Sequence, residues 1–182
     1  MRYNKIFNFN ISDGPYIGVS LYTQGCPFHC KGCFNPETWD FDGGEEFTQE
    51  TADKIVSLLS KDYMRRLSIL GGEPLTEEKY SDLRNLIEQA VAYKNGDLWV
   101  WIWTGRKFDD VLGESKTNMF LRDILALTDF IVDGQFKLDQ KDLTLPFCGS
   151  RNQRIIDVQE SLKHNRTVLS QYDWRMKEAQ IG

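Results

Sequence analysis

Several features that mark particular protein classes are missing from this chain of 182 residues. It has no long apolar run, so we predict neither a signal peptide nor a membrane-spanning helix, and we expect the protein in the cytoplasm. It has no excess of positive charge either, because 22 basic residues stand against 27 acidic ones, and a general nucleic-acid-binding surface is not expected. No internal repeat or low-complexity run divides the chain, which predicts a single domain over residues 1–182.

Histidine and cysteine are scarce as well, with two and four residues respectively. Three of the cysteines, Cys26, Cys30 and Cys33, nevertheless share one short stretch that also contains glycine and proline, whereas Cys148 stands alone. A disulfide joins only two sulfurs, and clustered exposed thiols without a further role would oxidise. The spacing therefore indicates a metal centre held by this loop.

Two kinds of metal centre are compatible with the three cysteines. A structural zinc site needs four ligands, and only His29 is near enough in sequence to complete the set. Because His29 directly precedes Cys30, we expect its ring to point away from the sulfurs. A 4Fe-4S cluster held by three cysteines keeps one iron free of protein ligands, which leaves a place for a substrate or cofactor. We favour the cluster, keep zinc as the alternative, and interpret Cys148 as a small, partly buried residue.

Hydrophobic patterns predict alternating strands and helices, and hence an α/β fold with a mostly parallel sheet. The predicted strands are residues 16–22, 66–70, 98–103, 129–133 and 154–158, the predicted helices are 48–61, 76–95 and 118–127, and residues 1–14 are interpreted as a lead-in. The cysteine loop follows the first of these strands, and a glycine-rich turn follows the second. Since the carboxyl ends of parallel strands meet on one rim, we expect the two loops to lie close together.

The glycine-rich turn, residues 71–74, is a second candidate binding element. Its two adjacent glycines allow the backbone to approach a ligand and to offer both N–H and C=O groups to a zwitterion. We expect a bulky residue at Gly72 to abolish ligand binding without loss of the cluster.

Three tryptophans, at positions 99, 101 and 103, are predicted to lie on one face of a strand. The favoured interpretation is packing of this face against helices. A stacking platform for nucleic-acid bases is the less favoured alternative, because no basic stripe accompanies the aromatic residues.

The spacing Cys26-x3-Cys30-x2-Cys33 resembles the cluster motif of the radical S-adenosylmethionine superfamily. Residues 13–15, the Cys33–Trp39 segment and the Gly149–Asp157 segment are similar to those of the activating enzymes of anaerobic (class III) ribonucleotide reductases. The resemblance extends over about residues 13–157.

This resemblance implies a shortened, open form of the (βα) barrel, since a complete eight-fold barrel takes about 250 residues. It implies that Cys26, Cys30 and Cys33 hold a 4Fe-4S cluster, and that S-adenosylmethionine binds the remaining iron. The residues expected at the cofactor are Gly32, Cys33 and Phe34 on the nucleoside side and Gly71, Gly72 and Glu73 on the methionine side. No catalytic side chain beyond the cluster and the cofactor is implied.

The activity implied by the resemblance is reductive cleavage of S-adenosylmethionine, which generates a glycyl radical on anaerobic ribonucleoside-triphosphate reductase. The electron would come from a reduced flavodoxin-like protein or another donor, and residues 137–142 or 151–154 are candidate docking segments. Two alternatives remain: a small radical S-adenosylmethionine enzyme that acts on a small molecule, like the deazapurine carboxy synthases, and a non-enzymatic metal or electron-carrier module.

Overall fold

The computed structural model describes residues 1–178, whose strands form one open sheet with the order β3-β1-β2-β4-β5-β6-β7. The strands are β1 Arg2–Asn10, β2 Ile17–Thr23, β3 Glu45–Glu46, β4 Met64–Gly71, β5 Trp99–Trp103, β6 Phe130–Asp133 and β7 Arg154–Asp157. Neighbouring strands from β2 to β6 run parallel, whereas β1, β3 and β7 pair antiparallel at the edges. The predicted open α/β architecture is confirmed.

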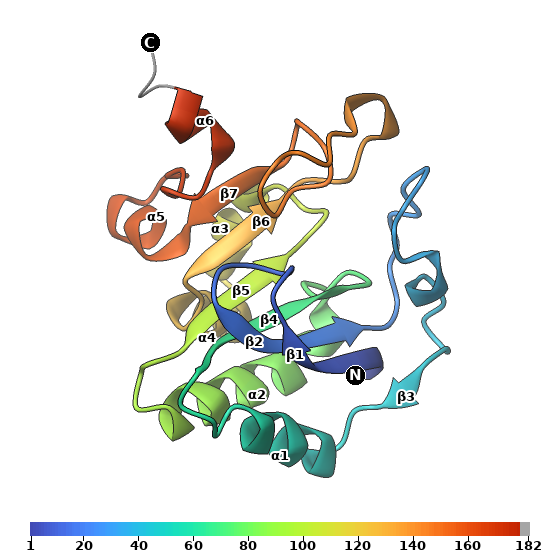
Figure 1. The fold of residues 1–182 in the computed structure, drawn as a ribbon, viewed down its shortest axis with the longest axis vertical. Coiled ribbons are helices and arrows are strands. Elements are labelled where there is room, and N and C mark those ends of the chain that lie inside the picture. Colours follow the sequence, from blue (N-terminus) through green and yellow to red (C-terminus); the bar gives the residue numbers. More distant parts are fainter. Residues whose placement is uncertain (179–182) are drawn as a thin grey trace.

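Helices follow the central strands, as the hydrophobic spacing predicts. They are α1 Gln49–Leu58, α2 Tyr80–Tyr93, α3 Phe108–Ser115, α4 Met119–Ala126, α5 Val158–His164 and α6 Trp174–Glu178. Thr48 caps α1, since its hydroxyl accepts a hydrogen bond from the Thr51 amide, and Asn118 caps α4 in the same manner. Figure 1 shows α1, α2 and α4 side by side along one face of the sheet, where α2 contacts both of its neighbours.

One prediction about a sheet edge is wrong. Residues 2–10 are not a lead-in but the strand β1, which pairs with β2 from Tyr3 to Asn10. Much of this strand is only partly buried or exposed, so it lacks the apolar alternation that marks a strand covered on one face. The last strand, β7, runs antiparallel to β6, because the chain returns through the loop 134–153 without a crossover helix. Helix α3 was also not predicted.

The tryptophan-bearing strand β5 separates the two halves of the core. Val100 and Ile102 face the helices, whereas Trp101 faces the opposite side together with Phe130. The rings that cover Trp101 there belong to Phe147 and Tyr172, at centroid distances of 5.4 and 5.6 Å. The predicted common face of the tryptophans is therefore confirmed, but it packs against loop residues instead of helices. Trp101 is fully buried and not available for base stacking.

Replacement of Trp101 by alanine is expected to lower the free energy of unfolding by about 3–5 kcal/mol, because it removes a large buried ring and leaves a cavity. Denaturant unfolding of the metal-free protein under anaerobic conditions measures this loss. The control is Met119→Ala at a side chain that is 56% exposed, where a change within about 0.5 kcal/mol is expected. Equal effects of the two substitutions would contradict the assigned core.

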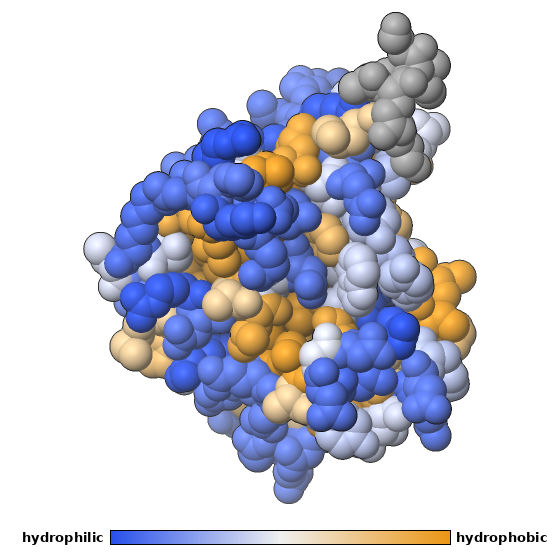
Figure 2. All heavy atoms as spheres, turned by 90° about the vertical axis from the view of Figure 1, so that its left-hand side faces the viewer, coloured by the Kyte–Doolittle hydropathy of each residue, from blue (hydrophilic) through white to orange (hydrophobic). Residues whose placement is uncertain are grey.

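The surface is mainly hydrophilic, in keeping with a sequence that lacks long apolar runs. Figure 2 shows the face on the left-hand side of Figure 1, where hydrophilic residues dominate and hydrophobic residues gather mainly in a central band. Among the described residues, no helix combines the length and the apolar character needed to cross a membrane.

Candidate metal centre and cofactor cavity

The cysteine loop begins where β2 ends and is closed by its own backbone. The amide of Gly25 donates to the Thr38 carbonyl oxygen at 2.8 Å, and the amide of Cys26 donates to the Trp39 carbonyl oxygen at 3.1 Å. Gly25 has a φ of +85°, a conformation that favours glycine and lets the chain leave the strand sharply. These bonds fix the root of the loop, which stands at the right of the sheet in Figure 1.

The three clustered cysteines are free and partly exposed, and they line one cavity of about 560 Å³. A backbone amide already points at one sulfur, since Asn35 N lies 3.4 Å from Cys33 Sγ. Burial raises the pKa of the Cys26 and Cys30 thiols above the ordinary value. Metal ligation requires thiolates, so loading of the site releases protons.

The donor set fits a cluster better than a single ion. The ring of His29 stacks on Trp39 at a centroid distance of 4.8 Å, and His29 is absent from the cavity lining. Within residues 1–178, no group of three or more His, Cys, Asp or Glu side chains is placed to hold one metal ion. A cubane binds each cysteine to a different iron, so it accepts sulfurs that are farther apart than the ligands of one ion. The position of His29 counts against a zinc site with this residue as the fourth ligand.

The turn at residues 71–74 lies directly against the root of the cysteine loop. The amide of Gly72 donates to the Thr23 carbonyl oxygen, and the amide of Glu73 donates to the Gly25 carbonyl oxygen, both at 2.9 Å. A Cβ atom at Gly72 would lie 2.5 Å from the Gly25 oxygen, and one at Gly71 would lie 2.9 Å from Tyr22 Cα. The glycines therefore permit close contact between the two loops, and added bulk at Gly72 disturbs the residue before Cys26 as well as the turn. We therefore no longer expect the cluster to survive a bulky residue at Gly72.

Glu73 connects this turn to the end of β5. Its carboxylate is buried and accepts hydrogen bonds from the Leu75 amide at 2.9 Å, the Thr104 hydroxyl at 2.6 Å and the Gly105 amide at 2.7 Å. Burial raises the pKa of Glu73, while the donors at Thr104, Gly105 and Leu75 oppose that rise. Oε2 accepts only the bond from Gly105, so it retains capacity for another donor on the cavity side.

Five of the six residues expected at the cofactor line the cavity: Cys33, Phe34, Gly71, Gly72 and Glu73. Phe34 is 53% exposed at its mouth, 5.0 Å from the ring of Phe136. Gly32, the sixth, is exposed and does not line the cavity; a Cβ atom there would approach Leu138 at 3.0 Å. The cavity brings these five residues together across two loops.

The opposite wall comes from the loop after β6, whose residues are not among the six expected at the cofactor. It is braced by side-chain amides, because Gln153 donates to the Gly134 carbonyl oxygen at 2.9 Å and Asn152 donates to the Gln135 carbonyl oxygen at 2.8 Å. Gln153 also accepts a hydrogen bond from the Gly149 amide at 2.8 Å. The polar segment at 149–153 therefore shapes the cavity wall.

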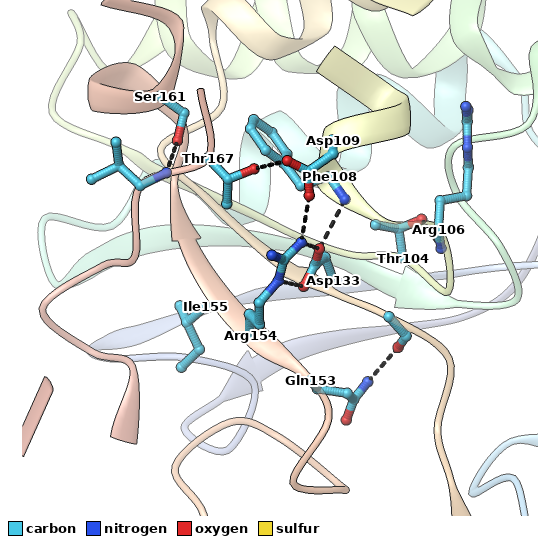
Figure 3. Close-up of polar contacts among 12 residues, drawn as sticks. Thr104, Arg106, Phe108, Asp109, Asp133, Gln153, Arg154, Ile155, Ser161 and Thr167 are labelled. Atoms are coloured by element: carbon cyan, nitrogen blue, oxygen red, sulfur yellow. Dashed lines mark hydrogen bonds and ion pairs between the residues drawn. The ribbon is translucent and has the colours of Figure 1, made fainter. Parts of the chain in front are cut away.

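Figure 3 shows how the end of β6 is fixed. Asp133 is buried, accepts a hydrogen bond from the Phe108 amide at the start of α3, and is paired with Arg154. Arg154 also contacts Asp109 at 3.0 Å, and Asp109 in turn accepts a hydrogen bond from Thr167. The Arg154 side chain is thus engaged within the protein.

Cys148 lines the same cavity from this opposite wall but differs from the other three cysteines. It is buried, and burial raises the pKa of its thiol to about 12. In the metal-free protein at pH 8, we expect iodoacetamide to modify Cys148 at least about tenfold more slowly than the clustered cysteines, because the thiolate is the reactive form. Peptide mass spectrometry over a time course measures the four rates. Modification of Cys148 at the same rate as Cys33 would contradict its burial.

An open, mostly parallel sheet with three free cysteines beside a glycine-rich turn is the arrangement expected of an iron-sulfur domain. In agreement, residues 12–156 match the family model described as a 4Fe-4S single cluster domain.

Three similar proteins share the name anaerobic ribonucleoside-triphosphate reductase-activating protein. That of Salmonella typhimurium is 34% identical, over 84% of this chain and 96% of its own. Those of Enterobacteria phage T4 and Escherichia coli (strain K12) are 33% and 32% identical, over 85% and 84% of this chain and 93% and 96% of their own. The chain belongs to this family of activating proteins.

Proposed function

We propose that this chain activates an anaerobic ribonucleoside-triphosphate reductase by generating a glycyl radical on it. The observation that carries the proposal is the cavity in which three free cysteines meet the Gly71–Glu73 turn, in a chain whose relatives bear that name. When bound, the 4Fe-4S cluster and S-adenosylmethionine would supply the one-electron radical chemistry that removes a hydrogen atom from a glycine of the reductase.

The residues of the chain bind, orient and shield these groups. Cys26, Cys30 and Cys33 hold the cluster. Glu73 Oε2 would accept a hydrogen bond from the amino group of the cofactor, because it accepts one hydrogen bond within the protein whereas Oε1 accepts two. Aromatic side chains at the cavity wall exclude water from the reacting carbon; they are Phe28, Phe34, Phe136 and Phe147.

The reductase docks at the mouth of the cavity, over the segment 137–142. Leu138 approaches Gly32, and the ammonium of Lys141 lies 5.4 Å from the Phe34 ring, so this segment borders the cysteine loop. The alternative docking segment, 151–154, is less suitable, because the side chain of Arg154 is already engaged in ion pairs with Asp109 and Asp133. A reduced flavodoxin-like protein or another one-electron donor reduces the cluster, and the activity takes place in the cytoplasm.

The test combines the reconstituted protein, a reductant, S-adenosylmethionine and the reductase without oxygen, and records the electron paramagnetic resonance spectrum. We expect a glycyl-radical doublet that requires all four components. Cofactor cleavage without a radical on the reductase would favour an enzyme that acts on a small molecule. A cluster that does not cleave the cofactor under reduction would favour an electron-carrier module.

A further inference from the structure

Lys79 is buried beside the cysteine loop, and its side chain is not explained by the binding roles described above. It ends the short 3-10 helix Glu77–Lys79 and is 1% exposed. Its Nζ donates to the Gly25 carbonyl oxygen at 2.8 Å and to the Glu73 carbonyl oxygen at 2.6 Å. Lysine is almost never fully buried unless it is paired. The side chain therefore joins the residue before Cys26 to the glycine-rich turn.

The surroundings of Lys79 favour the charged ammonium. Besides the two carbonyl oxygens, Glu78 Oε1 lies 3.9 Å from Nζ, and the ring of Phe41 lies 5.5 Å from it in a cation–π contact. Burial lowers the pKa of Lys79, and the negative charges of Glu78, Glu73 and Cys26 oppose this fall. The two carbonyl oxygens, the carboxylate and the aromatic face all interact more strongly with an ammonium than with a neutral amine, so the site favours a cation.

We propose that Lys79 is a positioning residue whose buried positive charge raises the reduction potential of the cluster. This inference rests on the proposed function, because it assumes a cluster at Cys26, Cys30 and Cys33. In the step concerned, the oxidised cluster takes one electron from the external low-potential donor, and no bond forms or breaks. A nearby cation stabilises the added negative charge, and water screens it poorly because the side chain is buried. Net charge and solvent exposure are known determinants of cluster potentials.

Three substitutions separate charge from hydrogen bonding. Lys79→Gln keeps an N–H donor near the two carbonyl oxygens but removes the charge, Lys79→Met removes both, and Lys79→Arg keeps the charge. Lys116→Gln is the control, since Lys116 is exposed at the end of α3. Each protein is reconstituted anaerobically and titrated with dithionite in the absence of S-adenosylmethionine, and electron paramagnetic resonance measures the fraction of reduced cluster at each potential.

We expect Lys79→Gln and Lys79→Met to lower the ratio of reduced to oxidised cluster at a fixed potential about tenfold, which corresponds to about 59 mV for one electron. Lys79→Arg and Lys116→Gln should stay close to the wild-type protein. A wild-type potential in Lys79→Gln would overturn the inference, as would a potential in Lys79→Arg as low as that of Lys79→Met. If the wild-type protein itself assembles no cluster, the proposed function fails; if it does and these shifts are missing, only the role of Lys79 fails.

Discussion

Replacement of any one of Cys26, Cys30 and Cys33 by alanine is expected to abolish activation of the reductase, with the largest effect of all single changes in the chain. The three free thiols line one cavity, and with two of them left the cluster has two irons without a protein ligand. Iron bound after anaerobic reconstitution should fall from about four atoms per chain to less than about one. Iron analysis and the glycyl-radical signal measure the two effects.

Cys148→Ala is the matched control, because Cys148 lines the same cavity but is buried on the opposite wall. This variant should retain about four irons per chain and an open iron for the cofactor. Loss of the cluster in Cys148→Ala, together with its retention in one of the three single variants, would show that the ligand set is wrong.

Gly72→Ala is expected to impair both the cluster and cofactor binding, although it adds a single methyl group. The new Cβ atom would lie 2.5 Å from the Gly25 carbonyl oxygen, so either the turn or the residue before Cys26 has to move. Overpacking of this kind costs about 1–3 kcal/mol. We therefore expect less than half of the wild-type iron after reconstitution and no measurable binding of S-adenosylmethionine, by iron analysis and isothermal calorimetry.

Gly113→Ala provides the matched control, because a Cβ atom at this position in α3 meets no atom within 4 Å. It should bind iron and cofactor like the wild-type protein and gain up to about 1 kcal/mol of stability. If Gly72→Ala kept its full iron and lost only the cofactor, the contact with the cysteine loop would be unimportant. Full retention of both would exclude the turn from the site.

The central part of the fold could be predicted from the sequence because its strands are short, mainly apolar runs and its helices bury one face each. Strand β5 and helix α2 carry uninterrupted apolar patterns, and both were found. The edges could not be found in this way. Strand β1 keeps several side chains partly exposed, and nothing in residues 154–157 encodes the direction in which β7 pairs with β6. Strand direction follows from the connection and not from the pattern.

The residues of the candidate site could likewise be predicted only in part. The three cysteines were recognisable because few other roles require thiols at that spacing, and the two glycines because they follow a strand. Lys79 gave no signal, since it follows Glu77 and Glu78 in a stretch typical of a solvated helix start. Its burial depends on the carbonyl oxygen of Gly25, which is distant in sequence. Partners of this kind become visible only when the chain is folded.

The loop between β6 and β7 forms one wall of the cavity and reaches the core mainly through residues 145–148. Between residues 134 and 153, few side chains are buried, and the side-chain amides of Asn152 and Gln153 contribute bracing hydrogen bonds. Segments with few buried contacts open at a lower free-energy cost than the strands that they connect. Backbone amides of this loop should therefore exchange with deuterium well before those of β4 and β5. Local opening can then widen the cavity for an incoming polypeptide while the sheet, the cysteine loop and the glycine-rich turn keep their positions.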